Sequence, residues 1–253
     1  MLLVADVHGA FDALGRVARR GDSLVILGDL INLIDYRTME GIVPDVIGSD
    51  IVEEVVRLRA EERYEEASEF WRRSTQLLDV DVRSAVGSLM QSDYEVMQTS
   101  LRGASGFVLY GNVDDPEVLK AHLPEGMEFV DAETRTINGL RFGFVGGGVP
   151  RIGSRGEVSE DEMRHKLAQL GPVDVLCTHV PPEIDMLAQD VISSPAKGST
   201  PVLEYIDEHE PMWHFFGDVH QPRATTWLRG ATRCTNVGYF RATGRPHVFL
   251  DGD

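Results

Sequence analysis

Residues 2–8 read Leu2-Leu3-Val4-Ala5-Asp6-Val7-His8, an apolar run that ends in an aspartate and a histidine. A short aliphatic run of this kind is typical of a buried strand in an α/β sheet. Further apolar runs lead to polar clusters at Gly28-Asp29, Gly111-Asn112, Thr178-His179 and Gly217-Asp218-Val219-His220. Because α/β sheets build their sites at the carboxyl ends of their strands, these clusters predict one shared polar site.

The side chains in these clusters are of the types that bind transition-metal ions. Neutral imidazoles, carboxylates and an amide oxygen suit Mn, Fe or Zn better than Ca or Mg alone. A carboxylate between two ions can hold them about 3.5–4 Å apart, where they clamp a phosphoryl group and generate a hydroxide nucleophile. Each histidine taken singly fits a core or capping role equally well, but the clusters together favour a metal site.

The clusters resemble the calcineurin-like metallophosphoesterase pattern D-x-H, G-D-x-x-[DN], G-N-x-[DE], H, G-H-x-H. The matching segments span residues 6–220, which is nearly the whole chain. The resemblance implies a four-layer αββα sandwich, in which two mixed β-sheets are flanked by helices, and two divalent metal ions at the strand ends. The metal ligands that it implies are Asp6, His8, Asp29, Asn112, His179, Asp218 and His220.

The resemblance also implies a role for each residue. The first ion is expected at Asp6, His8 and His220, and the second at Asn112 and His179, with Asp29 bridging both. The residues expected to act in catalysis are Asp29, Asn112 and Asp114.

Two residues depart from the family pattern. Val113 stands where many members have a histidine that can protonate the leaving group, and valine cannot donate a proton. Some bacterial members also lack this histidine, and the chain resembles that type. Asp218 stands where the pattern has a histidine, and either it ligates the second ion or it leaves that ion's site half-formed.

Asp218 also changes the expected charge of the site. An aspartate in place of a neutral histidine makes the metal cluster one unit less positive, which favours monoanionic phosphodiesters over dianionic phosphomonoesters. A hard oxygen ligand also favours Mn or Fe over Zn.

The composition fits one globular domain over residues 1–253, with 42% hydrophobic and 26% charged residues. No apolar run approaches the roughly 20 residues that cross a bilayer, and the first strand begins at Leu2, so we expect neither membrane association nor a signal peptide. The two cysteines, Cys177 and Cys234, form no disulfide framework, which favours a cytoplasmic protein. The net charge of −17 argues against tight non-specific binding of nucleic acid.

Local signals place several further elements. Apolar spacing predicts a helix over 11–20, and an Asp115-Pro116 start and a Ser159 start predict helices over 115–123 and 159–170. Asn138-Gly139 is a strong signal for a hairpin turn within 135–146.

Residues 33–105 are too many for a plain connection between the second and third clusters. Apolar residues at helical spacing predict one helix over about 52–78 and a second over about 82–101. We therefore expect a helical hairpin inserted into the single domain. The favoured interpretation is that the apolar stripe only packs the hairpin onto the sheet. The alternatives are that the hairpin forms a cap over the substrate pocket or a surface for homo-oligomer formation.

Residues 144–150, FVGGGVP, end another apolar run in three glycines, which let a backbone approach a ligand closely. A structural turn accounts for these glycines equally well. The candidate contacts for a substrate phosphate are Arg151 and Arg155, which follow this loop, and Arg223, which follows the last cluster.

The sequence thus predicts a dinuclear metal-dependent phosphoesterase that acts on a small phosphorylated substrate, a phosphodiester or a nucleotide, through a metal-activated hydroxide. Manganese or iron is the favoured metal. The alternatives are a phosphomonoesterase and a catalytically weak binding protein that keeps the fold.

Overall fold

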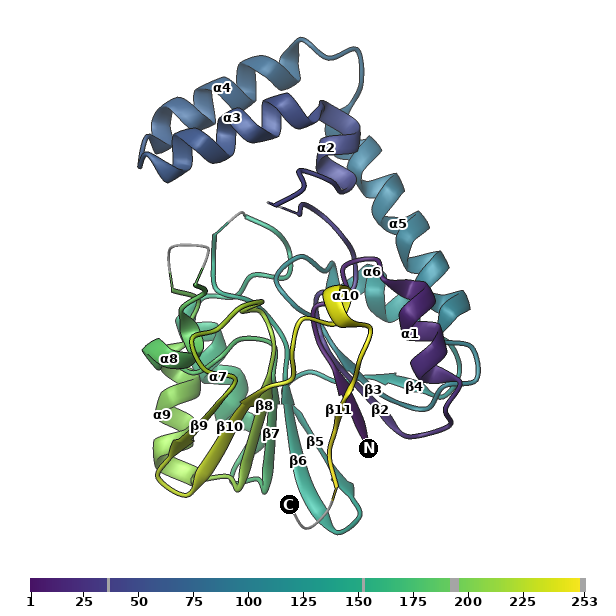
Figure 1. Ribbon diagram of the computed structural model, residues 1–253, viewed down its shortest axis with the longest axis vertical. Coiled ribbons are helices and arrows are strands. Elements are labelled where there is room, and N and C mark those ends of the chain that lie inside the picture. The colour runs from purple at the N-terminus through teal and green to yellow at the C-terminus, as the bar shows by residue number, and fades with distance from the viewer. Residues whose placement is uncertain (36, 152, 192–195, 251–253) are drawn as a thin grey trace. The chain divides into compact units, whose positions relative to one another are not determined.

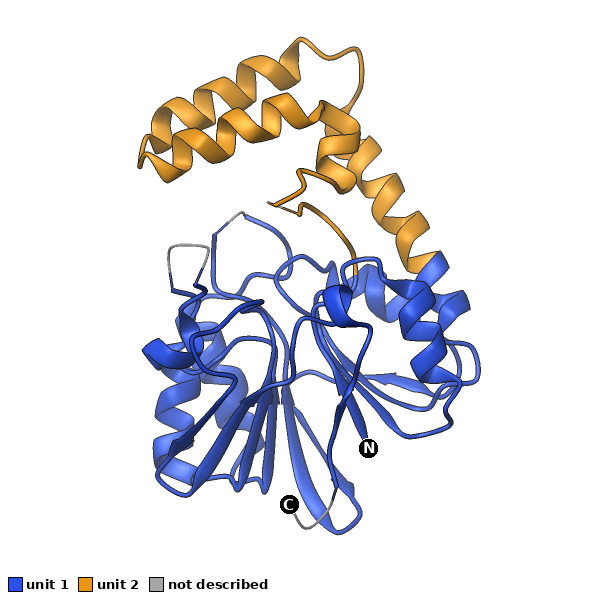
Figure 2. Cartoon of the chain, in the orientation of Figure 1, with its two compact units in different colours: residues 1–30, 96–253 blue, residues 31–95 orange. Residues whose placement is uncertain are grey.

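The computed structural model describes residues 1–250 except 36, 152 and 192–195. The chain forms two compact units (Figure 2). The larger unit comprises residues 1–30 and 96–253, and the smaller unit comprises residues 31–95.

The larger unit contains two mixed β-sheets, with the strand orders β11-β1-β2-β3-β4 and β5-β6-β7-β8-β10-β9 (Figure 1). The first sheet is built from β1 (Leu2–Val4), β2 (Leu24–Leu27), β3 (Gly106–Leu109), β4 (Met127–Phe129) and β11 (His247–Val248). The second is built from β5 (Glu133–Ile137), β6 (Leu140–Val145), β7 (Val175–Thr178), β8 (Trp213–Phe216), β9 (Thr226–Arg229) and β10 (Thr232–Asn236). Only the edge strands β11, β5 and β9 pair antiparallel in these sheets.

Apolar side chains fill the space between the two sheets and also cover the outer face of the second sheet. Leu3 and Val25 of the first sheet and Phe144 of the second belong to the core between the sheets. On the other face of the second sheet, Leu176 and Phe216 pack with residues of α7 (Glu160–Leu170) and α9 (Thr200–His209). Because both faces of the central parallel strands are covered, β1 and β2 are apolar along their whole length.

The remaining helices of this unit complete the layers. Figure 1 shows α1 (Phe11–Ala18) and α6 (Pro116–Ala121) beside the first sheet, opposite the helices of the second. Two short helices, α8 (Asp185–Ala188) and α10 (Phe240–Thr243), lie in the loops that follow β7 and β10. The expected sandwich of two mixed sheets flanked by helices is confirmed.

The smaller unit is helical. It contains α2 (Ile42–Ile47), α3 (Ser49–Ala60), α4 (Tyr64–Gln76) and most of α5 (Val82–Ser100). The prediction of one helix over 52–78 was wrong, because the chain turns at Glu62, whose φ is 60°. The apolar stripe belongs to two antiparallel helices, whose shared core is Val55, Leu58, Ala67, Phe70 and Trp71. No described helix has the length and apolar character needed to span a membrane.

His214 is a fully buried histidine in β8. Thr178 Oγ1 donates a hydrogen bond to the Val180 carbonyl at 2.6 Å, so it accepts the hydrogen from His214 Nε2 at 2.8 Å. Within the described residues, His214 Nδ1 has no hydrogen-bond partner. Burial lowers the pKa of His214 from its ordinary value of 6.5 to about 3, because a proton on Nδ1 would place an unpaired charge in the core.

We predict that His214 makes the protein less stable in mild acid. The unfolded chain takes up this proton near pH 6.5 and the folded chain only near pH 3, so stability is lost progressively as the pH falls from 6.5 to 3. Between pH 7 and pH 5 the loss of unfolding free energy should be about 2 kcal/mol. Urea unfolding of His214→Gln at both pH values should show a correspondingly smaller loss. His165→Gln, at an exposed position of α7, should behave as the unmodified protein, and equal losses in all three would refute the assignment.

Candidate metal centre

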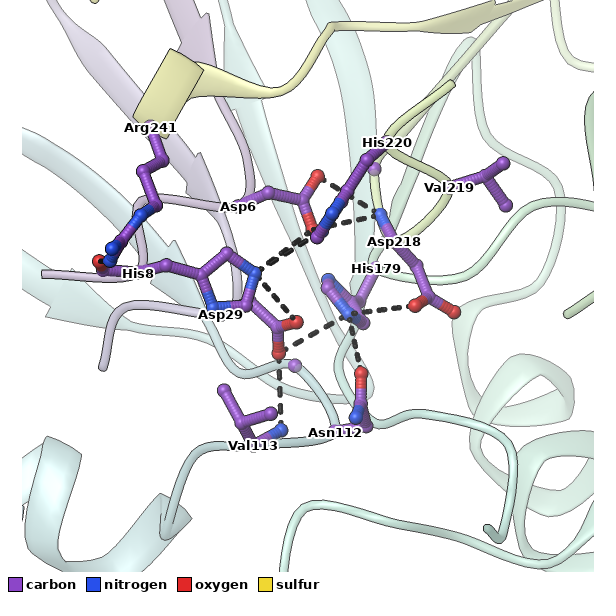
Figure 3. A network of polar contacts seen from close by, with 12 residues as sticks. Asp6, His8, Asp29, Asn112, Val113, His179, Asp218, Val219, His220 and Arg241 are labelled. Carbon is purple, nitrogen blue, oxygen red and sulfur yellow. Dashed lines mark hydrogen bonds and ion pairs between the residues drawn. The ribbon is translucent and has the colours of Figure 1, made fainter. Parts of the chain in front are cut away.

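The polar clusters follow the ends of five parallel strands. Asp6 and His8 come after β1, Asp29 after β2, and Asn112 after β3, and these three strands are neighbours in the first sheet. The neighbouring strands β7 and β8 of the second sheet lead to His179 and to the Asp218–His220 loop. Figure 3 shows that all seven predicted ligands lie in one cluster, to which both sheets contribute.

The first group of ligand atoms comprises Asp6, His8 and His220, whose atoms lie within 4.8 Å of one another. The Nε2 atoms of His8 and His220 are 3.3 Å apart, and His220 Nε2 is 3.5 Å from Asp6 Oδ1. Two ligands at about 2.0–2.1 Å from a tetrahedral metal ion are about 3.3 Å from each other. The spacing in this group therefore fits a divalent transition-metal ion.

The second group is centred on His179. Its Nε2 lies 3.3 Å from Asn112 Oδ1 and 3.4 Å from Asp29 Oδ1. Its Nδ1 lies 2.7 Å from the Leu27 carbonyl, which can only accept, so Nδ1 carries the hydrogen. This contact points Nε2 toward the cluster, an arrangement usual for a metal-binding histidine.

Asp29 lies between the two groups. Its Oδ2 is 3.5 Å from His8 Nε2, whereas its Oδ1 is 3.4 Å from His179 Nε2. The Val113 N–H donates to Oδ1 at 3.1 Å and fixes the plane of the carboxylate. A carboxylate with one oxygen toward each group has the geometry of a bridging ligand. Asp6 also reaches both groups.

The cluster is buried and brings mainly hydrogen-bond acceptors together. Burial alone raises the pKa of Asp29, but the neighbouring His179 outweighs it and lowers that pKa below its ordinary value. Burial likewise lowers the pKa of His179, but the charge of Asp29 outweighs it and raises that pKa to about 10. The site therefore demands a positive charge, and its donor set fits divalent ions.

The backbone is strained at these loops. Asp6, His8, Asp29 and Asp218 have φ values of 57°, 41°, 56° and 63°, which non-glycine residues seldom adopt. Such conformations cost about 1–3 kcal/mol each and cluster at functional sites, where the surrounding structure imposes them.

Two glycines of the motifs are required because no side chain fits there. A Cβ on Gly111 would lie 2.1 Å from Asp29 Oδ1 and 2.7 Å from His179 Cε1. A Cβ on Gly217 would lie 2.4 Å from the Ala5 Cβ and 2.7 Å from Asp6 Oδ2. The glycines thus let the backbone pass directly behind the ligands.

Asp114 points to the backbone of two ligand loops. Its carboxylate accepts hydrogen bonds from the N–H groups of Asp29 at 2.8 Å, Leu30 at 3.0 Å and Gly111 at 2.9 Å. Burial and the charge of Asp29 raise the pKa of Asp114 to about 6. The sequence predicted a catalytic role for Asp114, and these contacts show that its carboxylate holds the backbone of the loops after β2 and β3.

Sequence reasoning missed two residues that precede or begin α10. The ring of Tyr239 stacks on His220, with ring centroids 3.9 Å apart and planes 3° apart. Arg241 donates through Nη1 to the His8 carbonyl, and its backbone N–H donates to the Asp6 carbonyl at 3.0 Å. Neither residue belongs to a motif, so the sequence carried no signal for them.

Lys197 was also missed. Its ammonium donates to Asp218 Oδ1 at 2.6 Å and to the Asp218 carbonyl at 2.8 Å. The charge count made from the sequence omitted this residue. The Asp218–Lys197 pair is neutral, as an uncharged histidine at position 218 would be. Asp218 therefore does not make the metal cluster less positive, and the preference for monoanionic diesters no longer follows from its charge. The one available signal was rarity, since lysine occurs only at positions 120, 166 and 197.

The three candidate arginines have other contacts or positions. Arg155 pairs with Asp115 at 3.1 Å, and Arg151 donates to the Ala196 carbonyl. Arg223 is exposed, and no contact between it and the ligand cluster is found in the described part of the chain. The glycine loop before Arg151 has a structural role, because a Cβ on Gly148 would lie 2.1 Å from the Asn112 Cβ.

No protein-family model and no curated protein matches this chain. Solved structures do match. One crystal structure has a TM-score of 0.62 at 16% identity, with 94% of this chain and 90% of the other covered. The protein TT1561 of Thermus thermophilus has a TM-score of 0.52 at 12% identity, with 95% and 89% covered. At these identities the likeness shows the fold alone.

A third solved structure is less similar. It is a Staphylococcus aureus protein named provisionally as a 5′-nucleotidase, in complex with alpha-ketoglutarate. Its TM-score is 0.43 at 13% identity, and 94% of this chain and 48% of the other are covered. A likeness of this extent carries no conclusion about the present chain.

Proposed function

We propose that the protein is a metal-dependent phosphoesterase of the calcineurin-like type, with two divalent ions held at the ends of five parallel strands. The observation that carries the proposal is Asp29, whose two oxygens face His8 at 3.5 Å and His179 at 3.4 Å. A carboxylate shared by two groups of nitrogen and oxygen donors is the basis of a dinuclear hydrolytic centre.

The chain supplies ligands for both ions. The first ion would be held by Asp6, His8 and His220 and the second by Asn112 and His179, with Asp29 between them. When bound, the two ions would supply Lewis-acid stabilisation of a phosphoryl group and activation of water near neutral pH. Manganese or iron is the proposed metal because oxygen donors and imidazoles are mixed in the site.

The protein's own residues keep the ligands fixed. Asp114 and the Val113 N–H hold the Asp29 loop and its carboxylate. Tyr239 holds the ring of His220, and Arg241 holds the backbone beside His8. Ligands fixed before an ion or substrate arrives need little reorganisation during the reaction, which favours catalysis.

Val113 points to the substrate class. Its side chain is buried and cannot protonate a leaving group, and its N–H is used by Asp29. Substrates whose leaving group departs without a proton are therefore favoured. We propose a phosphodiester or a nucleotide with a good leaving group, and this preference rests on Val113 rather than on the charge of Asp218.

The test is hydrolysis of bis(4-nitrophenyl) phosphate and of 4-nitrophenyl phosphate by protein stripped with a chelator. We expect no turnover before metal is added, recovery with Mn²⁺ or Fe²⁺, and a higher kcat/KM for the diester. A higher kcat/KM for the monoester would instead support a phosphomonoesterase. Two bound ions without hydrolysis of either ester would identify a binding protein that keeps the fold.

A further inference from the structure

Lys197 places a positive charge beside the second group of ligands. Its ammonium contacts both Oδ1 and the carbonyl of Asp218, at 2.6 Å and 2.8 Å. The side chain of Lys197 is 27% exposed and that of Asp218 is 4% exposed, so water and salt screen this ion pair only weakly. Asp218 Oδ1 is 4.0 Å from His179 Nε2, which is farther than the 3.3 Å to Asn112 Oδ1.

An ammonium and a metal ion compete for the same oxygen. A charged lysine has three donors and no acceptor, so Lys197 cannot itself be a ligand. While it holds Asp218 Oδ1, it occupies the oxygen that faces His179 and repels a cation that approaches it. The backbone of Asp218 is fixed as well, because its N–H lies 3.1 Å from both oxygens of Asp6.

Lys197 lowers the negative charge that the cluster offers to metal ions. Asp6, Asp29 and Asp218 carry three negative charges, and Lys197 carries one positive charge, which leaves two negative charges if the histidines are neutral. One divalent ion neutralises these groups, so the charge of Lys197 makes a second ion less favourable than it would be without this lysine.

We propose that Lys197 keeps Asp218 as its counter-ion, so that only Asp29, Asn112 and His179 serve the second ion and the protein binds one ion tightly and the second weakly. Lys197 is then a positioning residue that sets the metal concentration at which the centre becomes dinuclear. The inference rests on the proposed function for the ion-binding residues, but its test measures metal binding and not turnover.

The experiment titrates chelator-stripped protein with Mn²⁺ by calorimetry and by equilibrium dialysis with metal counting. The unmodified protein should bind one ion tightly and a second one weakly. Lys197→Met removes the charge and frees Asp218, so it should tighten the second ion at least about tenfold. Asp218→Asn leaves Lys197 without its counter-ion, so it should weaken the second ion. The double variant Lys197→Met/Asp218→Asn keeps the charge balance, so its second Kd should be close to that of the unmodified protein.

Lys120→Met is the matched control. It removes the same charge from an exposed lysine that lies 5.7 Å from the Phe129 ring, and it should leave both Kd values unchanged. An unchanged or weaker second ion in Lys197→Met would overturn the proposal. So would a large loss of the second ion in the double variant, because its charge balance equals that of the unmodified protein and the loss would mean that Asp218 already ligates in the presence of Lys197.

A second measurement uses the unmodified chain and does not depend on the stability of any variant. Protein labelled with ¹³C at lysine Cε gives signals from only three lysines. On titration with diamagnetic Zn²⁺, the Lys197 signal should shift mainly with the second equivalent. A shift that is complete after the first equivalent would contradict the proposal.

The outcomes separate this inference from the proposed function. If the metal titrations give the expected Kd values but neither ester is hydrolysed, the proposed function is refuted and the role of Lys197 is supported. Hydrolysis together with a second Kd that Lys197→Met does not change would refute the role of Lys197 alone. A chain that binds no divalent ion would overturn both.

Discussion

Asp29→Asn should lower kcat/KM for the activated diester by about 10³-fold or more while the protein stays folded. The carboxylate is the only described side chain with oxygens 3.5 Å or less from both His8 Nε2 and His179 Nε2. Asparagine has nearly the same shape, but it lacks the negative charge and has only one oxygen. It can therefore bind the ion at the His8 group or the ion at the His179 group, but it cannot bridge the two. A loss of this size corresponds to about 4 kcal/mol, as expected when a central electrostatic group is removed.

Steady-state kinetics and metal counting on the same samples would measure this effect. Asp22→Asn is the matched control, because Asp22 is exposed just before the amino end of β2, whereas Asp29 follows its carboxyl end. The control should retain turnover and both ions. Wild-type turnover in Asp29→Asn would rule out the bridging role and with it the proposed centre.

Gly111→Ala should damage the centre through the backbone rather than through a ligand. The added Cβ would lie 2.1 Å from Asp29 Oδ1, 2.6 Å from the Asp29 backbone nitrogen and 2.7 Å from His179 Cε1. The loops after β2 and β3 must move apart to admit it. We expect a loss of about 1–3 kcal/mol in unfolding free energy, as for overpacked cores, and loss of the second ion.

Urea unfolding of the metal-free protein and metal counting at saturating Mn²⁺ would measure the two effects separately. Gly87→Ala is the control, because a Cβ at this exposed position of α5 meets no atom within 4 Å. It should stabilise the protein by about 0.5–1 kcal/mol, since alanine is the better helix former. Equal stability and metal content in Gly111→Ala and the unmodified protein would show that the loops absorb the methyl group freely.

The sequence alone predicted features that depend on neighbouring residues. Asp115 and Ser159 cap helices as expected, because each side chain accepts hydrogen bonds from N–H groups two or three residues ahead. Asn138-Gly139 forms the two-residue turn between β5 and β6, with φ values of 50° and 84°. The order of the strand-end clusters likewise predicted which side chains meet, because parallel strands bring their carboxyl ends to one edge.

The tertiary structure decided what depends on residues far apart in the chain. The apolar stripe after residue 50 fits one helix or two, and only the packing of Val55 and Leu58 against Ala67 selects the hairpin of α3 and α4. The partner of Asp218 lies 21 residues away in a loop that matches no motif, and Arg241 reaches His8 over a separation of 233 residues. The charge and rigidity of the site depend on these contacts, which periodicity and motif spacing do not encode because folding alone brings such residues together.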